Sequence, residues 1–180
     1  NITSLSDAAA DRTPLTFSPD GRYLFSTNEQ GQPMRWDVSQ TPELTVWLLP
    51  PDFGTSVSQS IVISEDGRWL AAAYYDEVMI WDVATQSVYQ QLTFPEEEQS
   101  QVTALAFTPD GRYLAAGSNQ YATDESYLYL WQLGEGDPEM PLWLGNESVQ
   151  TLDFSRDGAL LAVGTQHAGY VLTVDKLVKE

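Results

Sequence analysis

Cysteine is absent from this chain of 180 residues, and histidine occurs once, as His167. The lack of cysteine excludes a disulfide framework, a thiolate nucleophile and a cysteine-ligated metal site. No nucleophile motif accompanies the histidine, and a single histidine cannot form a His-x-x-x-His metal site. We therefore expect no enzymatic activity, no catalytic residue, no metal and no cofactor. We expect His167 to be an exposed loop residue.

Basic residues are scarce, because 8 Lys and Arg residues stand against 26 Asp and Glu residues, for a formal net charge of −18. Such a charge repels nucleic acid phosphates and anionic membrane surfaces, so neither is expected as a partner. It favours a protein partner with a basic surface. Adaptation to a salty or acidic medium would give the same excess, and the sequence leaves both explanations open.

Long apolar runs are also missing, since the sequence has no stretch of 18 consecutive apolar residues. The first 15 residues lack the basic start and the apolar centre of a signal peptide. These absences predict a soluble protein without membrane insertion. They favour a cytoplasmic location without fixing it, since a removed leader would leave no trace. The hydrophobic content of 42% is sufficient for a folded core.

One sequence pattern occurs in four copies along the chain. Each copy joins two apolar runs through an Asp-Gly pair, which is typical of a tight hairpin with a positive φ at the glycine. The pairs begin at residues 20, 66, 110 and 157, so their spacings are 46, 44 and 47 residues. A period in the forties indicates a repeat architecture. Its structural turn positions are Gly21, Gly67, Gly111 and Gly158.

A third apolar strand follows each hairpin at a nearly fixed distance. It ends in a Trp-Asp pair or a degraded version of one: Trp36-Asp37, Trp81-Asp82, Trp131-Gln132 and Val174-Asp175. In these features the chain resembles the WD-repeat β-propeller family, in its divergent bacterial form. The resemblance implies an all-β fold of four four-stranded antiparallel blades. These blades would form half or part of a larger, seven- or eight-bladed propeller.

The repeats predict one propeller segment over residues 1–180, with blades at about 14–49, 58–92, 102–144 and 149–175. Inner strands such as LAAAYY and VTALAF are almost continuously apolar, which is typical of strands buried on both faces. The third copy has extra residues between its second and third strands, and we place them in a loop from Asn119 to Ser126.

The last copy ends after its third strand, and residues 2–5 have the character of a strand. We expect this N-terminal strand to complete the last blade as a clasp. Four blades are few for a closed ring, so we expect an open arc that exposes two apolar end faces. Its partner would be a second copy or further blades of a parent chain.

The family's internal polar network requires a histidine before the first strand of each blade, and the Gly-His pair is missing from all four copies. The resemblance therefore implies that no blade has a complete network, with Asp76 as the nearest match to the network aspartate. Arg22, Arg68 and Arg112 each follow a turn aspartate by two residues, and we predict that they are structural.

Propeller geometry implies two loop faces. The resemblance places the connections from second to third and from fourth to first strands on a top face, and the hairpin turns on a bottom face. Acidic and aromatic residues gather in the top loops, whereas the turn arginines belong to the bottom. The predicted partner-binding residues are Phe53, Tyr75, Asp76, Glu96, Glu97, Glu98, Tyr121, Asp124 and Glu125.

Phe53 is the best candidate for an exposed anchor, whereas Tyr74 and Tyr75 have the alternative of packing inward at the end of a strand. The sequence thus predicts a noncatalytic protein-interaction scaffold with an acidic, aromatic top face. Salt should weaken its binding to a basic partner. A self-assembling propeller module is the main alternative, and a ligand-binding or enzymatic propeller is a less supported one.

Overall fold

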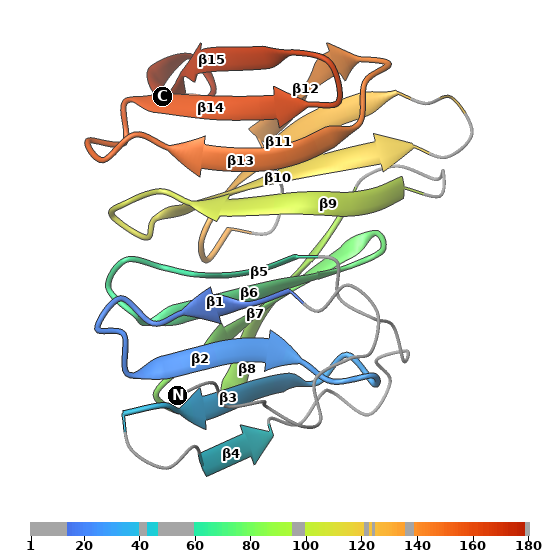
Figure 1. The fold of residues 1–180 in the computed structure, drawn as a ribbon. Helices are drawn as coiled ribbons and strands as arrows, with labels where there is room; N and C mark the ends of the chain where they lie inside the picture. The colour runs from blue at the N-terminus through green and yellow to red at the C-terminus, as the bar shows by residue number, and fades with distance from the viewer. Residues whose placement is uncertain are drawn as a thin grey trace.

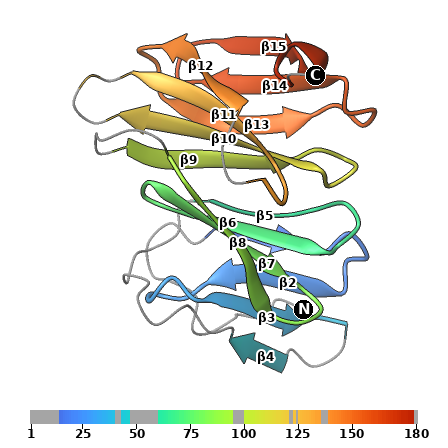
Figure 2. The ribbon, with the colours of Figure 1, turned by 180° about the vertical axis from the view of Figure 1, so that it is seen from behind.

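The computed structural model of the chain describes residues 14–39, 43–46, 60–94, 100–120, 123, 125–135 and 139–178. Within these residues, fifteen strands form four separate antiparallel sheets. The sheets are stacked in chain order from one end of the molecule to the other (Figure 1), and the view from behind shows the same order (Figure 2). The predicted all-β array of blades is confirmed.

Blades 1 and 2 each contain four strands. Blade 1 consists of β1 (Thr16–Phe17), β2 (Tyr23–Thr27), β3 (Pro33–Asp37) and β4 (Glu43–Val46). Blade 2 consists of β5 (Ser60–Ile63), β6 (Trp69–Tyr74), β7 (Glu77–Asp82) and β8 (Ser87–Thr93). Each strand pairs with the next one in sequence, so the first and fourth strands form the two edges of a blade.

Blade 3 has four strands and blade 4 has three in the described part of the chain. Blade 3 consists of β9 (Ser100–Phe107), β10 (Tyr113–Gln120), β11 (Ser126–Gln132) and β12 (Glu139–Gly145). Blade 4 consists of β13 (Val149–Phe154), β14 (Leu160–Thr165) and β15 (Gly169–Thr173), followed by the 3-10 turn η1 (Val174–Lys176). The proposed clasp at residues 2–5 lies outside the described residues, so the clasp and the single segment over 1–180 stay predictions.

The four Asp-Gly turns lie along one edge of the stack (Figure 1). The four turn glycines have φ values between +66° and +72°, as the hairpin pattern predicts. A side chain at this φ would crowd the backbone, which explains why the repeat uses glycine there. We call this edge the bottom face. The top face is the opposite edge, which carries the β6–β7 and β14–β15 turns.

The third copy extends its hairpin further than the sequence predicts. Strand β10 continues to Gln120, β11 already begins at Ser126, and Asn119 pairs with Ser126. The extra residues therefore lengthen two paired strands in addition to the connecting loop. A backbone hydrogen bond from the Gln120 N–H to the Glu125 carbonyl, 2.8 Å long, closes the hairpin.

Neighbouring blades pack face to face. We call the face turned toward the next blade the leading face, and the face turned toward the previous blade the trailing face. Between blades 2 and 3, Ala71 and Ile80 on the leading face share one core with Leu114 and Trp131 on the trailing face. Every side chain of β6 is buried, which confirms the prediction of strands buried on both faces.

The two ends of the stack differ in exposure. On the leading face of blade 4, Leu160, Ala162 and Val171 are exposed. On the trailing face of blade 1, Met34 and Trp36 are buried. The blade 4 end therefore exposes apolar side chains, and at the blade 1 end Leu15, just before β1, and Phe17, in β1, are exposed as well.

The strand register corrects the Trp-Asp alignment in blade 4. Trp81 pairs with Leu70, and the equivalent leucine of blade 4, Leu161, pairs with Leu172. The signature position is therefore occupied by Leu172 and Thr173, and the predicted pair Val174-Asp175 lies two residues further on, in η1. The apolar run VLTV offers two hydrophobic candidates for the signature position, and only the pairing with β14 distinguishes them.

Candidate functional site

The bottom face is built from one hydrogen-bonded turn that occurs four times. In blade 2 the Ser64 hydroxyl donates to the Asp66 carboxylate over 2.5 Å, and the Arg68 N–H donates to the same carboxylate over 2.9 Å. The Ser64 oxygen also accepts from the Trp69 N–H, 2.9 Å away. The same arrangement holds in the other three turns, with Ser18, Thr108 and Ser155 as the hydroxyl residues.

Sequence reasoning missed these hydroxyl residues. A Ser or Thr stands two positions before the aspartate in all four copies, and that fixed spacing is the signal that could have identified them. The carboxylate and the hydroxyl satisfy backbone N–H groups that the tight turn leaves free. The turn is therefore rigid, and it fixes where the carboxylates stand on the bottom face.

The two Trp-Asp aspartates hold the end of the third strand. Asp37 forms an ion pair with Arg22 at 2.8 Å, and its other oxygen accepts from the Ser39 hydroxyl. The hydrogen bonds from Ser39 and Arg22 lower the pKa of Asp37 to about 2. Asp82 accepts backbone N–H bonds from Ala84 and Thr85. Arg22 and Arg68 thus connect their hairpins to the end of the third strand, which supports a structural role for these two, whereas Arg112 pairs with Asp110 in its own turn.

The signature tryptophans belong to the core. Trp81 and Trp131 are fully buried, and their indole N–H groups have no hydrogen-bond partner among the described residues. Asp76, the nearest match to the network aspartate, is exposed at the β6–β7 turn. The described residues therefore contain no completed polar network around either indole, as the missing Gly-His pairs imply.

Three of the nine predicted partner-binding residues lie in the described part of the chain, and all three are on the top face. Tyr75 and Asp76 form the exposed β6–β7 turn, whereas Glu125 is half-buried before β11. Glu125 accepts hydrogen bonds of 3.2 Å from the Thr123 and Tyr127 hydroxyls. The other six predicted residues lie outside the described residues: Phe53, Glu96, Glu97, Glu98, Tyr121 and Asp124.

Two adjacent tyrosines at the top of blade 2 have opposite roles. Tyr74 is buried and its hydroxyl donates to the Gly31 carbonyl of blade 1 over 2.5 Å, while burial raises the pKa of that hydroxyl. Tyr75 is 52% exposed, with a φ of +47°. Its carbonyl accepts the Val102 N–H of blade 3 at 2.6 Å. The exposed ring therefore stands on a backbone that is fixed to the next blade.

A polar clamp joins blades 3 and 4 at the same face. The side-chain Oδ1 of Asn119 accepts from the Val149 N–H and the Ser126 hydroxyl, each at 3.0 Å. The Thr165 hydroxyl donates to the Glu147 carboxylate over 2.5 Å. The sequence does not predict these three hydrogen bonds, since no motif connects the residues that they join.

His167 lies exposed in the β14–β15 turn, as predicted. Within the described ranges, the structure contains no group of three or more His, Asp or Glu side chains arranged to hold a metal ion. No helix in the described part of the chain is long and apolar enough to cross a membrane.

Comparison with known proteins identifies the repeat type. A family model described as "WD domain, G-beta repeat" matches residues 89–132, from β8 to β11. The LST8 homolog of Drosophila melanogaster is 26% identical over 137 residues, covering 76% of this chain and 41% of the relative. The small ribosomal subunit protein RACK1y of Oryza sativa subsp. japonica is 34% identical over 108 residues, covering 57% of this chain and 30% of the relative.

Pre-mRNA-processing factor 19 homolog 2 of Arabidopsis thaliana is 26% identical over 157 residues, covering 86% of this chain and 28% of the relative. The matched part therefore spans less than half the length of each of these three relatives.

Proposed function

Because the chain is a WD-repeat protein of the β-propeller class, we propose that it is a noncatalytic scaffold that binds a basic protein partner through its top face. The observation that carries the proposal is Tyr75, a large exposed aromatic side chain in a left-handed conformation that non-glycine residues rarely adopt. Strain of this kind persists where the surroundings enforce it, and it is frequent at functional positions.

The charge around Tyr75 supports a basic partner. Asp76 and Glu77 follow the tyrosine directly, and Glu125 and Glu147 lie in top-face connections of blades 3 and 4. On the bottom face, the turn arginines form ion pairs with aspartates, so part of the negative charge there is neutralised. A rigid aromatic side chain surrounded by charges of one sign is common at protein-recognition surfaces.

The relatives support a role in assemblies. The names of two similar proteins place them in the small ribosomal subunit and in pre-mRNA processing. The noncatalytic part of the proposal has its own test. Turnover of a defined substrate by the purified chain, lost when His167 or a top-face acid is replaced, would contradict it.

The partner proposal is tested with labelled poly-L-lysine as the basic probe. We expect binding that weakens steeply with added NaCl, because salt screens exposed charges. Replacing Asp76 with Asn and Glu125 with Gln should lower the affinity several-fold. The Tyr75→Asn variant removes the ring and keeps a residue type that tolerates the left-handed backbone. It should lower the affinity without changing the salt dependence.

The matched control is Asp153→Asn, which removes one charge from the exposed face of blade 4. If this variant weakens binding as much as Asp76→Asn does, net charge alone attracts the probe and the top-face proposal is wrong. Binding that does not respond to salt would contradict it as well.

Self-assembly is the second candidate function, and the leading face of blade 4 favours it. Val171 is 69% exposed and Leu160 is 43% exposed on a face that the other blades bury. A second copy or a further blade would cover these side chains. Light scattering should then show a dimer or a larger species that the Val171→Asp variant disperses, whereas a monodisperse monomer would reject this candidate.

A further inference from the structure

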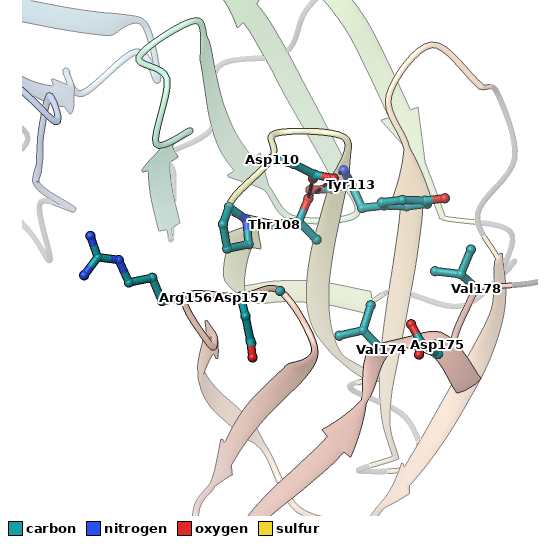
Figure 3. Close-up of a pocket in the computed structure, with 10 residues that line it drawn as sticks. Thr108, Asp110, Tyr113, Arg156, Asp157, Val174, Asp175 and Val178 are labelled. Carbon is teal, nitrogen blue, oxygen red and sulfur yellow. Dashed lines mark hydrogen bonds between the residues drawn. The ribbon is translucent and has the colours of Figure 1, made fainter.

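A cavity of about 540 Å³ opens on the bottom face between the turns of blades 3 and 4. Figure 3 shows the residues that line it. Asp110 and Tyr113 come from the turn and second strand of blade 3, Asp157 comes from the turn of blade 4, and Val174 and Asp175 come from η1. Its volume falls within the range of about 300–1,000 Å³ that is usual for binding pockets.

The lining combines carboxylates with apolar side chains. Asp110, Asp157 and Asp175 contribute three acids, while Tyr113, Val174 and Val178 contribute apolar surface. Arg156 is at the rim, and its side chain extends away from the other labelled residues (Figure 3). The charged groups gathered around the cavity are therefore mainly negative.

The turn geometry fixes two of these acids in place. The Asp157 carboxylate accepts from the Ser155 hydroxyl over 2.6 Å and from the Ala159 N–H over 3.1 Å. These hydrogen bonds lower the pKa of Asp157, so the carboxylate is charged over the whole neutral range. Asp110 is held in the same way by Thr108 and the Arg112 N–H, and its carboxylate also forms an ion pair with the Arg112 side chain at 3.9 Å. Both acids are therefore preorganised.

The cavity occurs a second time, at the equivalent place between blades 1 and 2. There Asp20, Asp66, Tyr23 and Val83 take the places of Asp110, Asp157, Tyr113 and Val174, and the volume is about 240 Å³. Phe25 and Ile63 also line this smaller cavity. The repeat thus creates the same kind of space at two blade junctions, and its size depends on the side chains that fill it.

At the junction between blades 2 and 3, a tryptophan lies beside the turn of blade 3. A Cβ placed on Gly111 would lie 3.8 Å from the Trp69 ring. Trp69 stands where blades 1 and 3 have Tyr23 and Tyr113. The cavity between blades 3 and 4 is larger than the one between blades 1 and 2, and it carries an additional acid, Asp175.

We propose that the cavity between blades 3 and 4 binds an arginine or lysine side chain of a partner peptide. The alkyl stem of that side chain lies against Tyr113 and Val174, and its cationic group lies among the carboxylates of Asp110, Asp157 and Asp175. Long basic side chains commonly place an apolar stem on apolar surface and keep the charged group near acids or water. The site is on the opposite face from Tyr75 and does not depend on the top-face proposal.

The test follows amide chemical shifts of the full chain while a short peptide with one central arginine is added. The same peptide with citrulline in place of arginine has nearly the same shape and no charge. We expect saturable shifts at Tyr113, Asp157 and Gly158 with the arginine peptide, and at least fivefold weaker binding of the citrulline peptide.

Two variants locate the binding. The Asp157→Asn variant keeps an oxygen that can accept the turn hydrogen bonds and removes the charge, so it should fold normally and weaken binding several-fold. The matched control, Asp66→Asn, makes the same change at the smaller cavity and should leave binding unchanged. Equal binding of both peptides, equal loss in both variants, or shifts confined to the top face would overturn the proposal.

Discussion

The leading faces of blades 3 and 4 are built from the same positions of the repeat, yet one is core and the other is surface. In blade 3, Ala115 pairs with Leu130, and both are buried against blade 4. In blade 4, the equivalent Ala162 pairs with Val171, and both are exposed. In the described part of the chain, these leading-face positions are thus buried where the next blade packs on them and exposed on blade 4, as expected for a repeat protein in which each unit contacts its neighbours.

The exposed face is also more polar than its buried counterpart. Asp153 pairs with Ala162, whereas in blade 3 the corresponding partner of Ala115 is Ala106. The Asp153 carboxylate is hydrated on this exposed face, and burying it beneath a tightly packed apolar blade would cost free energy. The leading face of blade 4 is therefore intermediate in polarity between a solvent-exposed surface and a buried blade interface. Matched substitutions on the leading faces of blades 3 and 4 can measure how much each face contributes to stability.

The largest effect is expected at Leu130. Leu130→Asp places a charge in the core between blades 3 and 4, where the side chain is 3% exposed. An unpaired buried charge destabilises by roughly 3–5 kcal/mol or more, so the domain should be largely unfolded. Val171→Asp, at the equivalent position of blade 4, should change the unfolding free energy by about 0.5 kcal/mol or less. Urea denaturation of the two variants checks the comparison, and similar losses in both would contradict it.

The next effect concerns the close approach of blades 3 and 4 at Gly117. A Cβ at this position would lie 2.4 Å from Val149 Cγ1, so Gly117→Ala forces the blades apart. Overpacking of this kind costs about 1–3 kcal/mol. The double variant with Val149→Ala should recover part of the loss, since the clashing methyl groups are gone. A double-mutant cycle measures the coupling, and purely additive losses would show that the contact is not the cause.

Much of the fold could be predicted from the sequence because its signals are local. The Asp-Gly pairs fix the hairpins and the positive φ of positions such as Gly111. The continuous apolar run of β6 indicates a strand covered on both faces, and it is buried throughout. The register of β15 was harder to predict. Without a tryptophan, nothing in the local pattern shows whether Leu172 or Val174 occupies the signature position.

The candidate site was less predictable, because its details depend on contacts between blades. The sequence gives no sign that Tyr74 reaches the Gly31 carbonyl while Tyr75 turns outward. The clamp at Asn119 and the cavity beside Asp157 likewise bring together residues from adjacent blades. All nine predicted partner-binding residues stay predictions, and six of them, Phe53 among them, lie outside the described ranges.

A smaller effect is expected in the turns, where interior and end blades should behave alike. Gly111 and Gly158 have φ values of +66° and +71°. The nearest atoms to an added Cβ are 3.8 Å and 3.5 Å away. Replacement by Ala therefore costs mainly backbone strain, about 1–2 kcal/mol at each site. Thermal unfolding of the two variants should give similar shifts, and a much larger loss in blade 3 than in blade 4 would mean that the turns also carry inter-blade packing.

The smallest effect is a pH dependence that blade 1 has and blade 4 lacks at the signature position. Asp37 has a pKa of about 2 in the folded chain, below its ordinary value of 3.8, because Ser39 and Arg22 hydrogen-bond to its carboxylate. The unfolded state therefore binds the proton more readily, so the stabilisation is fully present above about pH 4. It is lost as the pH falls toward 2. Thr173 occupies this position in blade 4 and cannot titrate.

Urea denaturation between about pH 2 and pH 5 measures this contribution, which is limited because the Arg22–Asp37 pair is solvent-exposed. We expect Asp37→Asn to flatten the rise of stability with pH in this interval, whereas Thr173→Asn should leave the slope unchanged. Added salt should reduce the difference between the wild-type chain and Asp37→Asn, since screening weakens an exposed ion pair. If Asp37→Asn keeps the full slope, the low pKa of Asp37 does not contribute to folding, and blades 1 and 4 do not differ in this respect.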